Sequence, residues 1–370
     1  MTPFDPDRHE TDSTVAARTV SSEETGPIKA PILAFDGSRE RCEGLFARPW
    51  TTALRTAARS AAEIARRLGL DPSSVVGGRA GEQQFSALAP DEYLIKIRRD
   101  DPNDPLLRQI LPLAAETHAV AGFDQDPLRE QDARRAPGLL QKYAGRALLI
   151  MTGACAIHCR YCFRRHFDYG REPHSIAAWE PALRELENDS TIHEIILSGG
   201  DPLTLVDDRL KLLIDRLTEI KHLRRLRVHS RLPLIIPQRV TQGLLAVLKP
   251  QRVASWFVLH CNHPNELDSQ TLESLTKLRN AGIGLLNQAV LLRGINDTVE
   301  TQRELCERLV DHGILPYYLH QLDPVAGAAH FQVPIATGRA IRSQLLNQLS
   351  GYAVPRYVWE QPGGLSKQPL

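Results

Sequence analysis

Three cysteines near the middle of the chain, Cys155, Cys159 and Cys162, have the spacing C-x3-C-x2-C. Thiolates are the usual protein ligands of iron–sulfur clusters, and three of them can bind three irons of a [4Fe–4S] cube while the fourth iron stays open. A zinc site completed by His158 or His166 is the alternative. Zinc prefers four protein ligands and paired C-x2-C units, and the sequence has no second such unit. We therefore predict a four-iron cluster on the three cysteines.

A second short motif, Ser198-Gly199-Gly200-Asp201, follows an apolar segment that reads as a strand. Its glycines would let the backbone approach a ligand closely. Taken alone, the motif is an ordinary turn from a strand into a helix, with Asp201 as the helix cap. After a cysteine triplet it resembles a motif of the radical S-adenosylmethionine (SAM) superfamily, whose open iron is chelated by SAM. That resemblance implies that these four residues bind SAM.

The elements around these motifs alternate in a regular way. Short apolar segments recur at steps of roughly 30 residues and alternate with helical stretches such as 207–220 and 273–282, as in repeated βα units. The six segments are 147–153, 194–200, 225–231, 255–261, 282–292 and 315–321. The predicted fold is α/β, a partial (β/α)6 TIM-like barrel of the radical SAM type with an N-terminal helical region. Polar residues at the strand ends should converge on one mouth of the barrel, where such folds place their active sites.

The chain divides into three predicted parts. Residues 1–28 are polar and rich in Ser, Thr and Pro, which is typical of a flexible N-terminal arm. Residues 29–143 form a mainly helical region, in which 51–70 is the clearest amphipathic run. Residues 144–370 form the radical SAM barrel and end in a loop that carries a lysine.

The composition gives no sign of a polyanionic or membrane partner. Lys and Arg number 45 against 44 Asp and Glu, so the net charge of +1 offers no bulk attraction to nucleic acid or to an anionic lipid surface. No stretch approaches the roughly 18 apolar residues of a membrane span, and the N-terminus lacks a secretory pattern. Six cysteines are too few for a disulfide scaffold in 370 residues. We expect a cytoplasmic protein without nucleic-acid or membrane partners.

The chain ends in Pro362-Gly363-Gly364-Leu365-Ser366-Lys367 and three further residues. A lysine so close to a terminus is normally a solvated tail residue. The proline and the two glycines, however, form a tight loop that could present the Lys367 amine to an aldehyde. Pyridoxal phosphate (PLP) requires such a lysine.

Several ordered blocks make residues 90–370 similar to the lysine 2,3-aminomutase family. They are CAIHCRYCFRRHF, SGGDPL, HSRLPLIIPQRVT, HCNHPNE, LLNQAVLLRGIND, PYYLHQLDPVAGAAHF and PGGLSK. The resemblance implies that Lys367 carries PLP and that Arg164 holds the carboxylate of a lysine substrate. It further implies that Asp323 and Glu360 hold the distal ammonium of that substrate.

The chemistry of these residue types fits such a substrate. Lysine has a carboxylate, an α-amine and a distant ammonium, which call for a guanidinium, an aldehyde and carboxylates respectively. Outside the family context, Arg164 would be a surface cation and Asp323 a loop acid. The resemblance also implies PLP contacts from Lys142, Tyr143 and Arg146, although arginine is common in the family where Lys142 stands.

The resemblance extends to the branch of the family that modifies elongation factor P. The chain stops soon after Lys367, whereas the catabolic enzymes continue, and Glu360 stands where those enzymes have aspartate. The branch implies (R)-β-lysine as product, a β-lysyl synthetase-like ligase that uses it, and an electron donor such as flavodoxin or ferredoxin. The alternatives are a free-lysine or related amino-acid mutase and, from another class, a non-catalytic metal-binding or redox-sensing protein.

Overall fold

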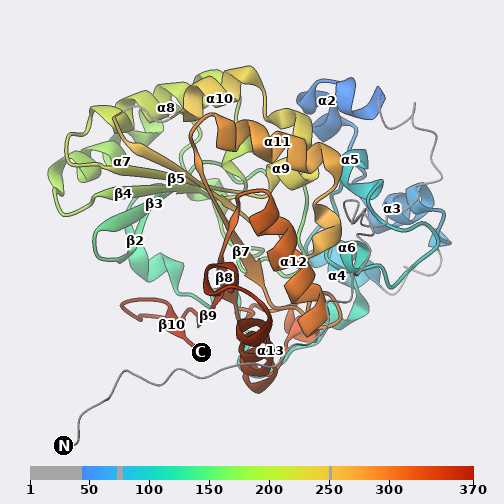
Figure 1. Cartoon of the computed structure of the whole chain (residues 1–370). Helices are drawn as coiled ribbons and strands as arrows, with labels where there is room; N and C mark the ends of the chain where they lie inside the picture. The colour runs from blue at the N-terminus through green and yellow to red at the C-terminus, as the bar shows by residue number, and fades with distance from the viewer. Residues whose placement is uncertain (1–43, 73–77, 250–251) are drawn as a thin grey trace, which may run out of the picture.

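One continuous sheet organises the computed structural model, which describes residues 44–72, 78–249 and 252–370 (Figure 1). The predicted arm of residues 1–28 lies outside the described residues. Strands β3 to β9 are parallel, and β1, β2 and β10 extend the two ends of the sheet by antiparallel pairing. Within the described residues no pairing joins β1 to β10, so the sheet is an open, partial barrel. The predicted fold class is confirmed.

All six predicted strands are present, and each is followed by a helical segment. They are β3 (Arg146–Ile150), β4 (Glu194–Ser198), β5 (Arg225–Ser230), β6 (Ala254–Leu259), β7 (Gly284–Val290) and β8 (Leu315–His320). A seventh parallel strand, β9 (Arg356–Trp359), pairs with β8 and was not predicted. With four residues it is too short to give a periodic signal. It matters for the site because Glu360 follows it directly.

Helices cover the outer face of the sheet (Figure 1). They are α7 (Ile176–Asn188), α8 (Asp207–Glu219), α9 (Leu232–Ile235), α10 (Gln242–Leu248), α11 (Ser269–Asn280), α12 (Val299–Asp311) and α13 (Ile335–Gln348). Side chains at the N-caps of several of them, including Ser175, Asp268 and Thr298, accept a hydrogen bond from a backbone N–H of the first turn. These caps fix where each helix starts after its strand.

The region before the barrel differs in part from the prediction. The amphipathic run 51–70 forms two helices, α2 (Trp50–Arg55) and α3 (Ala61–Leu68), because Ala58 pairs with Ala89 and Ser60 caps the second helix. Further short helices follow, α4 (Arg79–Gln84), α5 (Asp91–Leu94) and α6 (Pro105–Arg108).

The prediction of mainly helical structure is wrong for the last part of this region. There the chain forms β1 (Arg134–Ala136) and β2 (Leu139–Tyr143), which turn at Gly138 with a φ of +77°. A left-handed glycine permits this tight turn, and β2 then covers the free edge of β3. The strand carries Lys142 and Tyr143 to the edge of the barrel.

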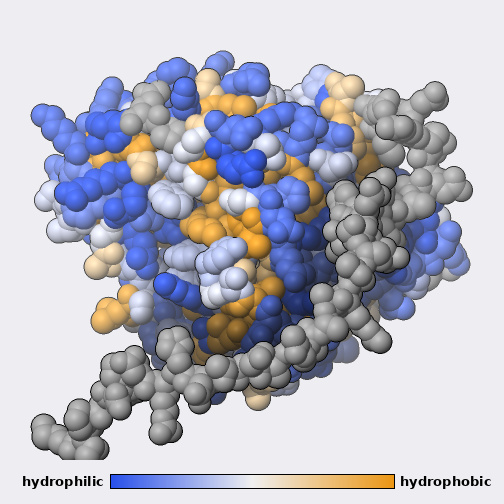
Figure 2. Space-filling view, viewed as in Figure 1, coloured by the Kyte–Doolittle hydropathy of each residue, from blue (hydrophilic) through white to orange (hydrophobic). Residues whose placement is uncertain are grey.

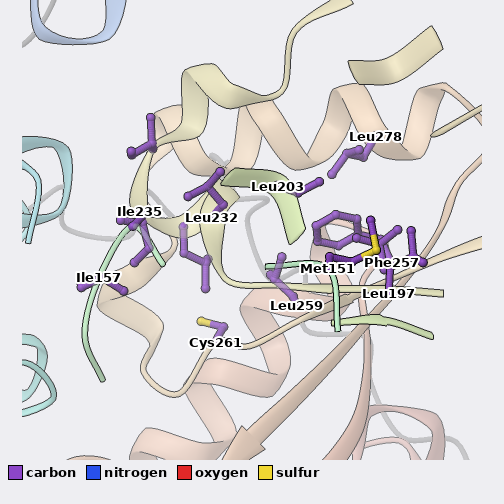
Figure 3. Packing of buried hydrophobic residues seen from close by; sticks show 14 of the residues in the cluster. Met151, Ile157, Leu197, Leu203, Leu232, Ile235, Phe257, Leu259, Cys261 and Leu278 are labelled. Atoms are coloured by element: carbon purple, nitrogen blue, oxygen red, sulfur yellow. The ribbon is translucent and has the colours of Figure 1, made fainter. Parts of the chain in front are cut away.

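A single apolar core joins the N-terminal helices to the sheet. Met151 and Ile157, on either side of Cys155, both belong to this core, Met151 beside Leu197 and Phe257 and Ile157 on the side of Ile235 (Figure 3). The cysteine loop is therefore anchored by its own apolar residues. The space-filling view shows hydrophilic residues around the rim of one face and hydrophobic residues mainly near its middle (Figure 2). None of the described helices combines the length and the apolar character that a membrane span requires.

Candidate active site at the carboxyl ends of the strands

The three cysteines lie on the loop that follows β3, half-buried and outside any disulfide. Burial raises the pKa of Cys162 to about 11, and the nearby Cys159 adds to the effect. Burial also raises the pKa of Cys155 well above its usual range, with Cys162 as the next contributor. The sulfurs are thus close enough to repel one another as thiolates. Such a group of thiolates needs positive charge among them, which the irons of a cluster supply.

Each histidine of the zinc alternative contacts a backbone carbonyl through one ring nitrogen. In the described ranges, no three His, Cys, Asp or Glu side chains gather so that they could hold one metal ion. His158 Nδ1 lies 2.7 Å from the Ser86 carbonyl oxygen, and His166 Nε2 lies 3.0 Å from that of Ala326. In a [4Fe–4S] cube each cysteine binds a different iron, so the three sulfurs do not have to converge on a single metal ion. The donor set therefore fits an iron–sulfur cube.

The Ser-Gly-Gly-Asp motif runs alongside the cysteine loop. Gly200 N donates to the Thr152 carbonyl at 2.7 Å, and Asp201 N donates to that of Ala154 at 2.8 Å. A Cβ on Gly200 would lie 2.3 Å from the Ala154 carbonyl oxygen, and Gly199 has a φ of +126°. Both positions therefore require glycine. The two glycines let the motif lie directly against the cysteine loop, where SAM is expected to bind.

The Asp201 side chain is fully engaged with protein groups. Its carboxylate accepts hydrogen bonds from the Ser230 hydroxyl at 2.8 Å and from the backbone N–H groups of Leu203, Arg231 and Leu232 at 2.9 to 3.1 Å. Burial raises the pKa of Asp201, although these donors oppose the shift. The Asp201 side chain therefore acts as a helix cap, as in the alternative interpretation of the motif. Asp201 holds the ends of β4 and β5 together.

A second group of charged side chains, the charge cluster, lies at the same end of the sheet. It consists of Glu130, Lys142, Arg164, Asp323, Glu360 and Lys367. Five of these were predicted as site residues, and Glu130 was missed. The structure therefore brings together residues from the start, the middle and the end of the barrel.

Glu360 accepts from two lysines in this cluster. Lys367 Nζ donates to Oε2 at 2.6 Å, and Lys142 Nζ donates to Oε1 at 3.1 Å. Burial alone would raise the pKa of Glu360, but the two ammonium groups outweigh it and hold the pKa well below its usual range. Glu360 is therefore an anion that already binds alkylammonium groups.

Asp323 lies just after β8 and has no such partner. Its Oδ1 is buried and accepts no hydrogen bond from the described part of the chain. Burial, reinforced by the negative charge of Glu360, raises the pKa of Asp323 to about 7. A buried carboxylate oxygen without a donor is available for a ligand cation.

Arg164 is buried and held by Glu130. Its Nε and Nη2 donate to the two oxygens of Glu130 at 2.6 and 2.9 Å, and its Nη1 donates to the Ser198 hydroxyl at 3.1 Å. Lys142 Nζ lies 3.5 Å from Glu130 Oε1, which links this pair to the rest of the cluster. Glu130 could not be predicted, because it starts a short 3-10 turn in a polar stretch without a hydrophobic period.

Tyr143 and Arg146 lie beside the charge cluster. The Arg146 guanidinium carbon is 4.6 Å from the centre of the Tyr143 ring. Burial and then the charge of Glu360 raise the pKa of Tyr143 above its usual range, which shows that the phenol is near that carboxylate. Tyr143 thus lies near Glu360, and Arg146 lies over the Tyr143 ring.

Three histidines add hydrogen-bonding atoms that no described residue uses. The buried Nε2 atoms of His229, His260 and His320, near the ends of β5, β6 and β8, have no partner in the described parts of the chain. Burial lowers the pKa of all three, to about 3 for His260. By contrast, Asn262 and His263 are engaged with neighbouring residues. The neutral imidazoles are thus available to bind a ligand.

Comparisons with known proteins agree with this site. The Radical SAM superfamily matches residues 149–309, which include the three cysteines and the Ser-Gly-Gly-Asp motif. The chain is therefore a radical SAM protein, and this implies a [4Fe–4S] cluster and SAM as its cofactors.

Similar proteins identify the family within the radical SAM superfamily. The L-lysine 2,3-aminomutase of Escherichia coli (strain K12) is 42% identical over 322 residues, which cover 87% of this chain and 94% of that protein. The protein of the same name from Haemophilus influenzae is 40% identical over 86% of this chain and 94% of its own length. That from Acetoanaerobium sticklandii is 36% identical over 87% of this chain and 78% of its own.

The chain belongs to the L-lysine 2,3-aminomutase family and is an isomerase. Among solved structures, a radical SAM methyltransferase from Sphaerobacter thermophilus shares 17% identity at a TM-score of 0.42, covering 60% of this chain and 68% of that one. That likeness is too weak to add to the argument.

Proposed function

We propose that this protein is a PLP-dependent lysine 2,3-aminomutase that converts L-α-lysine into (R)-β-lysine for the modification of elongation factor P. The observation that supports this most is the charge cluster. Within it, the Arg164 guanidinium, the Lys367 amine that would carry the PLP aldehyde, and the Asp323 and Glu360 carboxylates lie at the barrel mouth that also carries the cysteine loop. This set matches the carboxylate, the α-amine and the distal ammonium of lysine.

The cofactors would be held by residues from both sides of the mouth. Cys155, Cys159 and Cys162 would bind the cluster, and the 198–200 backbone would approach SAM. Lys367 would carry PLP, with Lys142, Tyr143 and Arg146 nearby. When bound, the cluster with SAM supplies a carbon radical that removes a hydrogen atom, and PLP supplies a π-system that delocalises an unpaired electron.

Glu360 would exchange one cation for another during binding. Its Oε2 accepts a hydrogen bond from the Lys367 ammonium at 2.6 Å. If Lys367 carries PLP, its nitrogen would be committed to the cofactor, and Glu360 would have one free ammonium partner fewer. The distal ammonium of lysine can then take that place, with Asp323 as the second carboxylate. Two acids at this end disfavour a substrate with a negative side chain, such as glutamate.

Arg164 would orient the other end of the substrate. Because Glu130 engages Nε and Nη2, the guanidinium plane is fixed before a ligand arrives. Nη1 donates to the Ser198 hydroxyl at 3.1 Å and to the Gly199 carbonyl at 3.4 Å, so a substrate carboxylate would take the place of these weaker contacts. A guanidinium with a fixed orientation loses little conformational entropy when it binds a ligand.

The physiological setting belongs to the same proposal. The electron donor would be a flavodoxin or ferredoxin, the product would pass to a β-lysyl synthetase-like ligase, and the enzyme would act in the cytoplasm without nucleic-acid or membrane partners. Glu360 in place of aspartate supports the elongation factor P branch. Catabolism of free lysine is the alternative within the family.

The test is anaerobic reconstitution with iron, sulfide, PLP and SAM, followed by reduction and addition of L-lysine. We expect a four-iron absorption spectrum and β-lysine, and chiral chromatography should identify the R form. Cys159→Ala should lose the cluster and the activity, whereas Lys367→Ala should keep the cluster and lose both PLP attachment and activity. Cys306→Ala, a buried cysteine on α12, is the matched control and should keep all of these properties.

Absence of β-lysine from protein that holds both cofactors would refute the proposed activity. Transfer to elongation factor P is tested separately, by incubating the product with the ligase and measuring the mass of the factor. A factor whose mass does not increase by one lysyl group would refute the branch and leave the isomerase activity standing.

A further inference from the structure

Arg231 is a buried arginine that the proposed chemistry does not yet use. It follows β5 directly and is 6% exposed. Its Nη1 lies 2.7 Å from the sulfur of Cys159. This is the one hydrogen bond from a side chain to any of the three clustered cysteines in the described part of the chain. A cationic donor is therefore aimed at one thiolate out of three.

The guanidinium is fixed from the side opposite the sulfur. Its Nη2 donates to Glu266 Oε2 and to Gln109 Oε1, each at 2.7 Å. The Glu266 carboxylate is itself held by the backbone N–H groups of Asn262 and His263 at 2.9 and 3.1 Å. Arg231 cannot turn away from Cys159 without breaking these charge-assisted hydrogen bonds in a buried place.

Two aromatic rings and a backbone hydrogen bond also hold Arg231 in place. The guanidinium carbon lies 5.6 Å from the ring centre of Tyr93 and 5.8 Å from that of Tyr161, within the range of cation–π attraction. The Arg231 backbone N–H donates to Asp201 at 2.9 Å. The side chain thus joins the N-terminal helices, the cysteine loop and the end of β5 in one rigid contact.

We propose that Arg231 is a positioning residue that raises the reduction potential of the cluster through its hydrogen bond to Cys159. When a one-electron donor such as dithionite or a reduced flavodoxin reduces the cluster from [4Fe–4S]2+ to [4Fe–4S]+, the cluster gains one negative charge. No covalent bond forms or breaks, and no proton is transferred. A fixed N–H donor and its positive charge stabilise the more negative state, because hydrogen bonds to the sulfurs set the potential of such clusters.

The inference rests on the proposed cluster, and its test is separate from activity. Arg231→Gln and wild-type protein are reconstituted anaerobically, and iron and sulfide are quantified. The midpoint potential is then measured by electron paramagnetic resonance during a dithionite titration, without SAM or lysine. We expect full cluster content in the variant and an equilibrium constant for reduction about tenfold smaller, a shift of about 59 mV to more negative potential for one electron.

Two further variants separate this role from a structural one. Arg231→Lys keeps the positive charge but loses the planar guanidinium that bonds to Cys159 on one side and to Glu266 on the other. The reduction potential of its cluster should therefore lie between those of the wild type and the glutamine variant. Arg239→Gln removes another buried arginine, which is bonded to the carbonyls of Leu203 and Leu205, and should leave the potential unchanged.

The outcomes are distinguishable. A glutamine variant with full cluster and the wild-type potential overturns the inference and leaves the proposed function intact. If the glutamine variant takes up no cluster, Arg231→Lys decides, and a wild-type potential in that variant overturns the inference as well. A wild-type protein that binds no cluster refutes the proposed function itself.

Discussion

The cysteine loop and the charge cluster lie at the same mouth of the barrel but are held by different forces. Backbone hydrogen bonds to the Ser-Gly-Gly-Asp motif hold the loop, and the carboxylate of Asp201 joins that motif to the end of β5. The charge cluster consists of ion pairs between side chains up to 218 positions apart, such as Lys142 and Glu360. One partner of each such pair can be replaced by a ligand group of the same charge.

This difference indicates how the two halves of the site would work. A loop held by its backbone keeps its geometry when the cofactors are absent, because the groups that hold it are not the groups that bind. In the charge cluster the same groups do both, so the proposed binding of PLP and lysine would rearrange the ion pairs. The following predictions test this contrast, from the largest expected effect to the smallest.

Asp201→Ala should give the largest effect and should act on stability. It leaves a hydroxyl and three backbone N–H groups without their acceptor, so we expect the free energy of unfolding to fall by about 3 kcal/mol. Denaturant unfolding of the cofactor-free protein, followed by circular dichroism under reducing conditions, measures this. Asp215→Ala on α8 removes an exposed carboxylate and should change stability by less than about 0.5 kcal/mol. Equal effects of the two variants would contradict the role assigned to Asp201.

Glu130→Gln should act mainly on substrate binding. Without the carboxylate, Arg164 keeps its charge but loses its fixed orientation, and we expect kcat/KM for lysine to fall about 10- to 100-fold, mostly through KM. Steady-state kinetics of the reconstituted enzyme measure the change. Glu172→Gln is the matched control, since Glu172 is equally buried and paired with Arg134 but lies outside the charge cluster. A normal KM in Glu130→Gln would show that Arg164 is positioned by other contacts.

The contrast between the two regions also explains which features of the fold and of the site could be predicted from the sequence. The six strands, the cysteine loop and the position of the Ser-Gly-Gly-Asp motif follow from local patterns, and all are found in the structure. Glu130 and Arg231 could not be predicted in this way, because their significance depends on contacts with Arg164 and Cys159 that only the folded chain creates. The alternative interpretation of Asp201 as a helix cap is confirmed, whereas its contacts with the end of β5 depend on the folded chain.

Two errors in the predicted elements have the same cause. Strand β9 and strands β1 and β2 are short and lie at the margins of the sheet, so pairing with a neighbour stabilises them more than their own pattern does. They nevertheless bring Lys142, Tyr143 and Glu360 to the site.

The pKa of Asp323 predicts a pH dependence of stability. With a pKa of about 7, the folded protein holds a proton that the unfolded chain, with an ordinary carboxyl, has already lost above pH of about 4. The wild type therefore loses stability as the pH rises from about 4 to about 7, and Asp323→Asn escapes this loss. We expect the variant to gain on the wild type across that range, by roughly 1 to 3 kcal/mol at pH 8. Unfolding of the cofactor-free proteins at several pH values tests this, and a constant difference would contradict it.

Lys142→Arg should give the smallest effect. Lys142 is paired with Glu360 at 3.1 Å and lies 3.5 Å from Glu130, so its charge links two acids without the directed fork that fixes Arg164. An arginine keeps the charge and can span both acids, and we expect less than about a threefold change in kcat/KM for lysine and in the affinity for PLP. Lys142→Met, which removes the charge, should reduce both more strongly. If the arginine variant loses as much as the methionine variant, the charge cluster depends on geometry as strictly as the cysteine loop does, and the contrast between the two regions fails.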